Sequence, residues 1–82
     1  MNYSELIINR INQQCKLRSW SINKLATLSG VKQSTLDNIM RGITKNPGLI
    51  SIHKIANTFN MTLAEFLDFE ELNSFSFDDD NE

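Results

Sequence analysis

Apolar residues recur at intervals of three and four along most of the chain, which is the spacing of side chains on one face of an α-helix. In the first such segment Ile7, Ile11 and Cys15 lie four residues apart, and they predict a helix over about residues 3–17. No segment before residue 72 shows the two-residue alternation of a β-strand. The pattern therefore indicates an all-α fold.

Two short helices follow, and a glycine separates them. Ser21 can cap the start of the first helix, and Gly30 suits the left-handed turn that ends it. Leu36 and Ile39 mark the inner face of the second helix, which Gly42 closes. This order of helix, glycine turn and helix predicts a helix-turn-helix motif within residues 21–42.

Two more helices complete the predicted domain. Gly48 precedes a helix that ends near Asn60, and Thr62 with Glu65 forms a capping box at the start of the next helix. The sequence thus predicts a compact bundle of five helices within residues 1–72, with the helix-turn-helix at its second and third helices.

Residues 73–82 form a polar, acidic C-terminal tail in which Phe75 and Phe77 are the apolar residues. The tail offers too little apolar surface to offset the entropy that ordering it would cost. We expect this segment to be mostly disordered.

The chemical inventory of the 82 residues is narrow. Cys15 is the only cysteine and His53 the only histidine, so neither an intramolecular disulfide nor a zinc site of Cys and His ligands is possible. No cofactor loop, metal-ligand set or acid–base pair is visible, and we expect a protein without cofactor or metal that is not an enzyme. The chain has neither a long apolar run nor the start of a secretory signal, which predicts a soluble, cytoplasmic protein with no membrane partner.

The net charge of −2 and the pI of about 5.3 argue weakly against a nucleic-acid partner, but the charges are segregated along the chain. All eight basic residues lie before residue 60 together with two acids, which gives +6. The remaining eight acids lie in residues 61–82, which hold no basic residue, giving −8. The first part of the chain can therefore meet phosphates, whereas the second cannot.

The sequence resembles the XRE or lambda-repressor-like helix-turn-helix family over about residues 5–69. The central segment reads SINKLATLSGVKQSTLDNIMRGITKNPGLISIHKIANTFNMTLAEF. The positions that carry the resemblance are Ala26, Gly30, Leu36, Ile39, Arg41-Gly42, Asn46-Pro47, Lys54-Ile55-Ala56 and Thr62 to Phe66. The resemblance implies a lambda-repressor-like DNA-binding domain whose second motif helix enters the major groove of double-stranded DNA.

By this resemblance the outer residues at the start of that helix read base edges, which places Gln33, Ser34 and Asn38 against the major groove. Helical geometry agrees, because residues 34 and 38 lie opposite the inner face and Gln33 opens the helix. Gln and Asn side chains can each form two hydrogen bonds with an adenine edge, so we expect contacted A·T pairs in the operator.

Lys32 departs from the family pattern, which usually has a small capping residue at this position. A cation is unfavourable at the positive end of a helix dipole, and a contact from Lys32 to a guanine edge or a phosphate would compensate. The alternative is an exposed lysine of modest cost. Asp37 would repel phosphates unless it pairs with Arg41 or Lys32, or accepts from a cytosine amino group, and its role stays open.

Phosphate contacts are expected on both sides of the reading residues, where they would fix the register of the protein on the duplex. The candidates are the backbone amides near Ile22 and the side chains of Asn23, Thr35, Arg41, Thr44, Lys45 and Asn46. The other basic side chains expected on solvated helix faces are Arg10, Lys16, Arg18 and Lys54.

The function implied is that of a small transcriptional regulator, a repressor that occupies a palindromic operator as a homodimer. One reading helix offers few base contacts, so two copies about 34 Å apart are the usual way to reach high affinity. Four apolar residues near the end of the last helix either form the dimer surface or simply close the bundle; they are Phe66, Leu67, Phe69 and Leu72.

An alternative function is an antitoxin-like or prophage protein-interaction module, with DNA binding secondary or lost. In this hypothesis the acidic, Phe-containing tail binds a protein partner, or it lies across the basic face as a mimic of DNA. A tail that only improves solubility is the third possibility.

Overall fold

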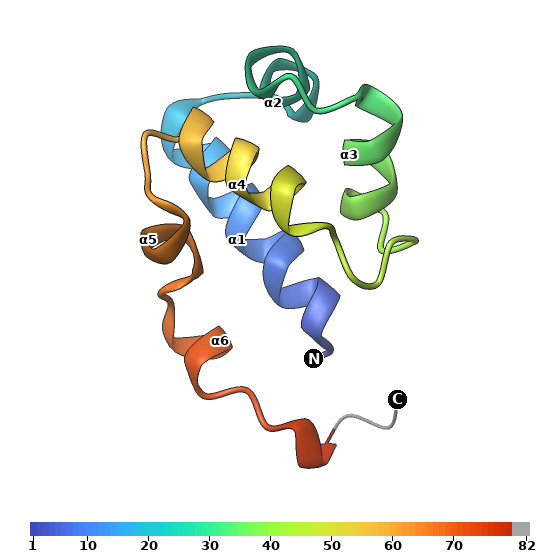
Figure 1. Ribbon diagram of the computed structural model, residues 1–82, viewed down its shortest axis with the longest axis vertical. Helices are drawn as coiled ribbons and strands as arrows, with labels where there is room; N and C mark the ends of the chain where they lie inside the picture. The colour runs from blue at the N-terminus through green and yellow to red at the C-terminus, as the bar shows by residue number, and fades with distance from the viewer. Residues whose placement is uncertain (80–82) are drawn as a thin grey trace.

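The computed structural model describes residues 1–79, and these residues form α-helices and one short 3-10 helix, with no strand among them (Figure 1). The elements in chain order are α1 (Tyr3–Arg18), α2 (Ile22–Ser29), α3 (Gln33–Met40), α4 (Leu49–Thr58), α5 (Leu63–Leu67), α6 (Glu70–Asn73) and the 3-10 helix η1 (Phe77–Asp79). The predicted all-α fold is confirmed. Of the helices described, none combines the length and the apolar composition that crossing a bilayer requires.

The predicted number of five helices is wrong, because the last segment forms two helices instead of one. α5 ends where Asp68 and Phe69 leave helical geometry, with φ of −87° and −140° and ψ of 82° and 150°. Had the helix continued, Leu72 would point about 180° away from Leu63 at 3.6 residues per turn. The break lets both side chains pack against the same core.

The helix starts depend on the caps that the sequence indicates. Ser21 Oγ accepts from the Lys24 N–H at 3.1 Å, and Gly48 occupies the N-cap of α4. Thr62 and Glu65 form the predicted capping box at α5. These confirmed caps fix where α2, α4 and α5 begin.

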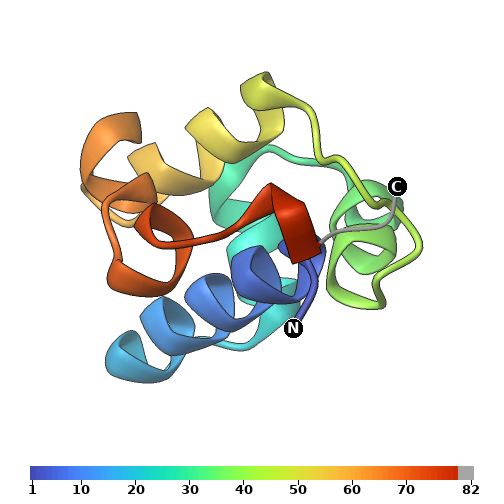
Figure 2. The ribbon, with the colours of Figure 1, turned by 90° about the horizontal axis from the view of Figure 1, so that it is seen from below.

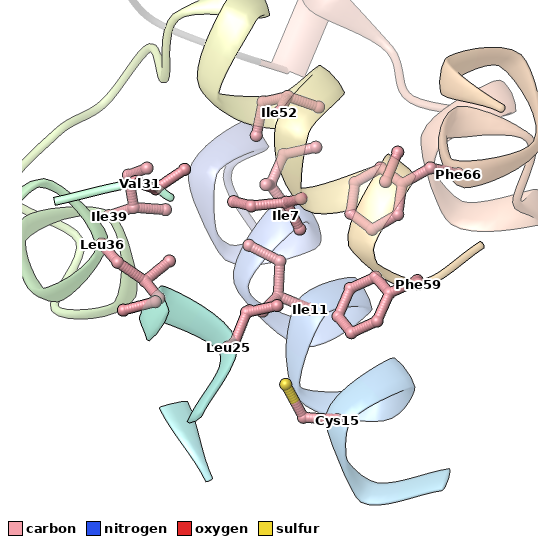
Figure 3. Close-up of a cluster of buried hydrophobic side chains, with 13 residues drawn as sticks. Ile7, Ile11, Cys15, Leu25, Val31, Leu36, Ile39, Ile52, Phe59 and Phe66 are labelled. Atoms are coloured by element: carbon pink, nitrogen blue, oxygen red, sulfur yellow. The ribbon is translucent and has the colours of Figure 1, made fainter. Parts of the chain in front are cut away.

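One apolar core holds α1 to α5 together (Figure 3). Ile11 of α1, Leu25 of α2, Leu36 of α3 and Ile55 of α4 are all 0% exposed. The ring of Phe59, which follows α4, stacks on that of Phe66 with centroids 6.1 Å apart. Because α3 contributes fully buried side chains to this core, its position relative to α1 and α2, which it contacts, is fixed.

Cys15 is a small apolar member of the core. Burial raises the pKa of the Cys15 thiol, while the positive charge of Arg18 acts in the opposite direction. The residue is therefore a packing element of α1, as its apolar neighbours in the sequence indicate.

Two arginines on α1 act as clamps, which corrects the expectation that they lie on solvated faces. Arg10 donates from Nε to the Phe66 carbonyl at 2.8 Å and from Nη2 to the Glu65 carbonyl at 3.0 Å. Arg18 donates from Nη2 to the Phe59 carbonyl at 2.6 Å, and its guanidinium lies 4.7 Å from the centre of the Phe59 ring. Both cations satisfy carbonyls at helix ends, where a positive charge is favourable.

The start of the acidic tail packs against the first residue of α1. The ring centroid of Phe75 lies 5.2 Å from that of Tyr3, and the Phe77 centroid lies 6.0 Å from Tyr3 and 5.1 Å from Phe75. This packing differs from the disorder expected for residues 73–82, because Tyr3 supplies apolar surface that the tail alone lacks. The same expectation for residues 80–82 falls outside the described part of the chain.

Candidate nucleic-acid interface

α2 and α3 are joined by a tight turn at Gly30. The Gly30 N–H donates to the Ala26 carbonyl at 3.1 Å, and the φ of 75° at Gly30 is one that side-chain-bearing residues rarely adopt. Val31 then turns into the core, where it is 6% exposed. This turn sets the angle between α2 and α3.

α3 has one buried side and one exposed side. Leu36 and Ile39 are 0% and 1% exposed, and they hold the helix against the core. The four residues predicted to read bases all have exposed side chains at the start and outer side of α3; they are Lys32, Gln33, Ser34 and Asn38. A rigid helix therefore presents a row of polar side chains to solvent.

Lys32 occupies the N-cap of α3, and its side chain makes no capping hydrogen bond. The Lys32 carbonyl accepts from the Leu36 N–H at 3.0 Å, so the backbone starts the helix without help from the side chain. The Lys32 side chain is exposed and does not cap the helix, so it is available for a contact with another molecule. The structure leaves both sequence interpretations of Lys32, a DNA contact and an exposed lysine, in place.

Asp37 has a partner that the sequence interpretation did not consider. The Gln33 Nε2 donates to Asp37 Oδ1 at 2.8 Å, one helical turn away on α3. Within residues 1–79 the Asp37 carboxylate thus bonds to Gln33 and not to Arg41 or Lys32. The signal was present in the sequence, because Gln and Asp four residues apart on a helix form such pairs.

The predicted phosphate-contacting residues fall into two groups. Ile22 and Asn23 are the first two residues of α2. The Leu25 N–H donates to the Ser21 carbonyl at 3.1 Å, and the backbone amides of Ile22 and Asn23 come before this first bond of the helical ladder. The others lie on α3 or just beyond it: Arg41, Lys45 and Asn46 are exposed, whereas Thr35 and Thr44 are half-buried.

The loop that follows α3 is tied to the end of that helix. The N–H groups of Ile43 and Thr44 both donate to the Asn38 carbonyl, at 3.0 and 3.1 Å. Gly42 permits this turn with a φ of 74°. The start of the loop is therefore held against the C-terminal half of α3.

The cations of residues 21–48 also lie apart in space from the acids of α5 and α6. α3 and the loop after it lie on one side of the molecule, and α5 and α6 lie on the other (Figures 1 and 2). Residues 21–48 hold four cations and one acid; the cations are Lys24, Lys32, Arg41 and Lys45 and the acid is Asp37. The acids Glu65, Glu70 and Glu71 belong to α5 and α6. A polyanion therefore meets less repulsion on the α3 side.

The expected dimer residues take up different positions. Phe66 is 0% exposed, and Leu67 and Leu72 are half-buried against the same core. Phe69 is half-buried, with its ring centre 5.0 Å from the Arg10 guanidinium. Of the two possibilities that the sequence left open, these contacts correspond to closing the bundle.

Comparisons with known proteins agree with this geometry. Residues 11–66 match the family model described as helix-turn-helix. The HTH-type transcriptional regulator SlrR of Bacillus subtilis (strain 168) is 39% identical over 57 residues, which is 70% of this chain and 38% of SlrR. The chain thus spans well under half the length of that relative.

A solved structure shows the same fold. The crystal structure of the prophage Lp1 protein 11 superimposes with a TM-score of 0.81 and 28% sequence identity, over 92% of this chain and 100% of that one. The family match covers α2, α3 and the core that supports them. The chain therefore belongs to the helix-turn-helix family, of the XRE type that its sequence resembles.

Proposed function

We propose that this protein binds double-stranded DNA in a sequence-specific manner and regulates transcription, as a repressor that occupies its operator. The observation that carries the proposal is the exposed polar row on α3, which is fixed from beneath by the buried side chains of Leu36 and Ile39. The name of the relative SlrR, a transcriptional regulator, supports the same function.

Gln33 and Asn38 carry most of the base recognition in this proposal. Each side chain has an amide that can pair with the N6 and N7 positions of adenine, and Ser34 lies beside them. Lys32 contacts a guanine edge or a phosphate. The amides of Ile22 and the side chains of Asn23, Thr35, Arg41, Thr44, Lys45 and Asn46 bind phosphates and fix the register.

A selection of binding sites from randomised duplexes tests the assignment. We expect the wild-type protein to select one motif, and Gln33→Ala and Asn38→Ala each to lose about 1–3 kcal/mol of discrimination at one base position. Lys45→Ala is the matched control, since removing a phosphate contact weakens all sequences similarly and flattens the salt dependence. Identical motifs for the wild type and both alanine variants would contradict the base-reading roles.

The operator is a palindrome in this proposal, and the protein binds it as a homodimer. Two reading helices on a palindrome contact successive turns of the major groove, about 34 Å apart. A selected motif with two inverted half-sites at this spacing supports the dimer. A single asymmetric half-site would support binding as a monomer.

The tail supplies a second candidate function, as a docking segment for a protein partner. The observation that favours it is Phe77, whose ring remains 70% exposed although it contacts Tyr3. Deleting residues 73–82 separates the possibilities: loss of a co-purifying protein supports a partner, and a large gain in DNA affinity supports a tail that shields the basic side. Unchanged affinity with no lost partner leaves a solubilising tail.

A further inference from the structure

Residues 21–48 contain four basic residues and one acid, Asp37. Asp37 lies on α3, the helix that the proposed function places in the major groove of DNA. An unpaired carboxylate there would repel the phosphates of the duplex. Its side chain is half-buried, and the proposed function gives it no task. The geometry around it indicates one.

The bond between Gln33 and Asp37 determines which way the Gln33 amide faces. Gln33 Nε2 lies 2.8 Å from Asp37 Oδ1. An ionised carboxylate only accepts hydrogen bonds, so the amide nitrogen must face Asp37 and the amide oxygen must face away. A Gln side chain without this neighbour can rotate its amide by half a turn with little cost.

The orientation leaves a specific pair of groups free for a base. Nε2 keeps its second hydrogen, and Oε1 keeps both lone pairs. A donor and an acceptor side by side match the N7 acceptor and N6 amino group of adenine, whereas the reversed amide would set donor against donor and acceptor against acceptor. The observed orientation of the Gln33 amide can therefore pair with adenine, whereas the reversed orientation cannot.

We infer that Asp37 is a positioning residue that sets the base preference of Gln33 by fixing the orientation of its amide. The inference rests on the proposed function, and it assigns Asp37 no direct contact with DNA. Fixing the side chain before binding also lowers the entropy cost of ordering it in the groove.

The test compares selected motifs for the wild type and Asp37→Asn, each with Gln33 intact and with Gln33→Ala. Asn has nearly the same size as Asp, but it can face Gln33 with either its oxygen or its nitrogen, so the amide is no longer fixed. We expect the preference for adenine at the Gln33 position to fall about threefold to tenfold, the effect of one hydrogen bond. The preference at the Asn38 position should stay unchanged, and in the Gln33→Ala background Asp37→Asn should have no effect on base preference.

Three outcomes overturn the inference. If Asp37→Asn raises the affinity for all duplexes by one factor and leaves the motif unchanged, Asp37 acts only through its charge. If its effect on base preference persists in the Gln33→Ala background, Asp37 contacts a base itself. If Asp37→Glu, which keeps the carboxylate, loses as much adenine preference as Asp37→Asn while both fold normally, the carboxylate is not the orienting group.

A measurement without DNA separates this inference from the proposed function. In the NMR spectrum of the free protein, the side-chain amide signals of Gln33 should shift in Asp37→Asn, while those of Asn38 should not. Unchanged Gln33 signals would contradict the bond to Asp37 whatever the protein binds. A wild-type protein that selects no motif would instead contradict the proposed function.

Discussion

Arg10 and Arg18 show how a single side chain can join distant parts of the chain. The carbonyls of Phe66, Glu65 and Phe59, to which they donate, lie between 41 and 56 residues away in the sequence. No local pattern predicts such a bond, since a lysine or arginine on a solvated face has the same spacing. The sequence therefore indicated that these residues lie on α1 but not what they contact.

Arg10→Ala should destabilise the protein by about 1–3 kcal/mol, because the carbonyls of Glu65 and Phe66 lose a charged donor. Urea unfolding followed by circular dichroism measures the loss. Lys16→Ala is the matched control, because it removes an exposed cation from the same helix. Equal midpoints for the two variants would show that the clamp contributes nothing.

The Gln33 and Asp37 pair was within reach of sequence reasoning, unlike the arginine clamps. A Gln and an Asp four residues apart are neighbours on any helix, so the pair needed only the prediction of α3, which was correct. The exposed positions of the candidate base-reading residues followed from the same helical spacing. What each of them contacts on DNA stays a prediction.

At the scale of elements, local signals located the helices well. Ser21, Gly48 and Thr62 occupy the N-caps of α2, α4 and α5, and Asn60 adopts a left-handed φ of 61° between α4 and α5. The division between α5 and α6 was missed because short helices lack a long periodic pattern. The sequence did contain a sign of this break. Leu63 and Leu72 are nine residues apart, so one continuous helix could not place both on the same face.

α3 begins with a poor cap, and this predicts opposite effects of one substitution. Lys32→Ser should stabilise the fold by about 1 kcal/mol, since a serine can accept from the free amides of the first turn. The same change should weaken DNA binding if Lys32 contacts the duplex. Thermal unfolding and binding titrations measure the two effects.

Lys24→Ser is the control, because it also removes an exposed lysine from the basic segment but creates no cap. Stability that rises without loss of DNA affinity would identify Lys32 as an exposed lysine with no role in binding. A loss of affinity in both lysine variants would point to general electrostatic attraction.

At the scale of the whole molecule, three of the exposed apolar side chains belong to the start of α4 and the loop before it, which follows α3. Leu49 and Ile50 open α4 with side chains 65% and 74% exposed, and Ile43 in the loop before α4 is 57% exposed. Phe66, by contrast, is fully buried. We therefore propose the start of α4 as the contact of the homodimer proposed above.

If the proposed homodimer forms through the start of α4, Ile50→Glu should shift it to monomer, because the interface would have to bury an unpaired charge. Sedimentation equilibrium measures the shift, and affinity for a palindromic duplex should fall more than affinity for a single half-site. Leu17→Glu is the matched control, as Leu17 is 73% exposed on α1. A dimer that survives Ile50→Glu would place the interface elsewhere.

The contact between Tyr3 and Phe77 brings two residues from opposite ends of the sequence within 6.0 Å between ring centres. The chain from residue 3 to residue 77 thus returns close to the point where it starts. A fluorophore attached at residue 3 and one attached at residue 77 would start from the same corner of the molecule. A substitution at Tyr3 is therefore expected to disturb the packing of Phe77, and a short covalent bridge between residues 3 and 77 should be tolerated with little strain.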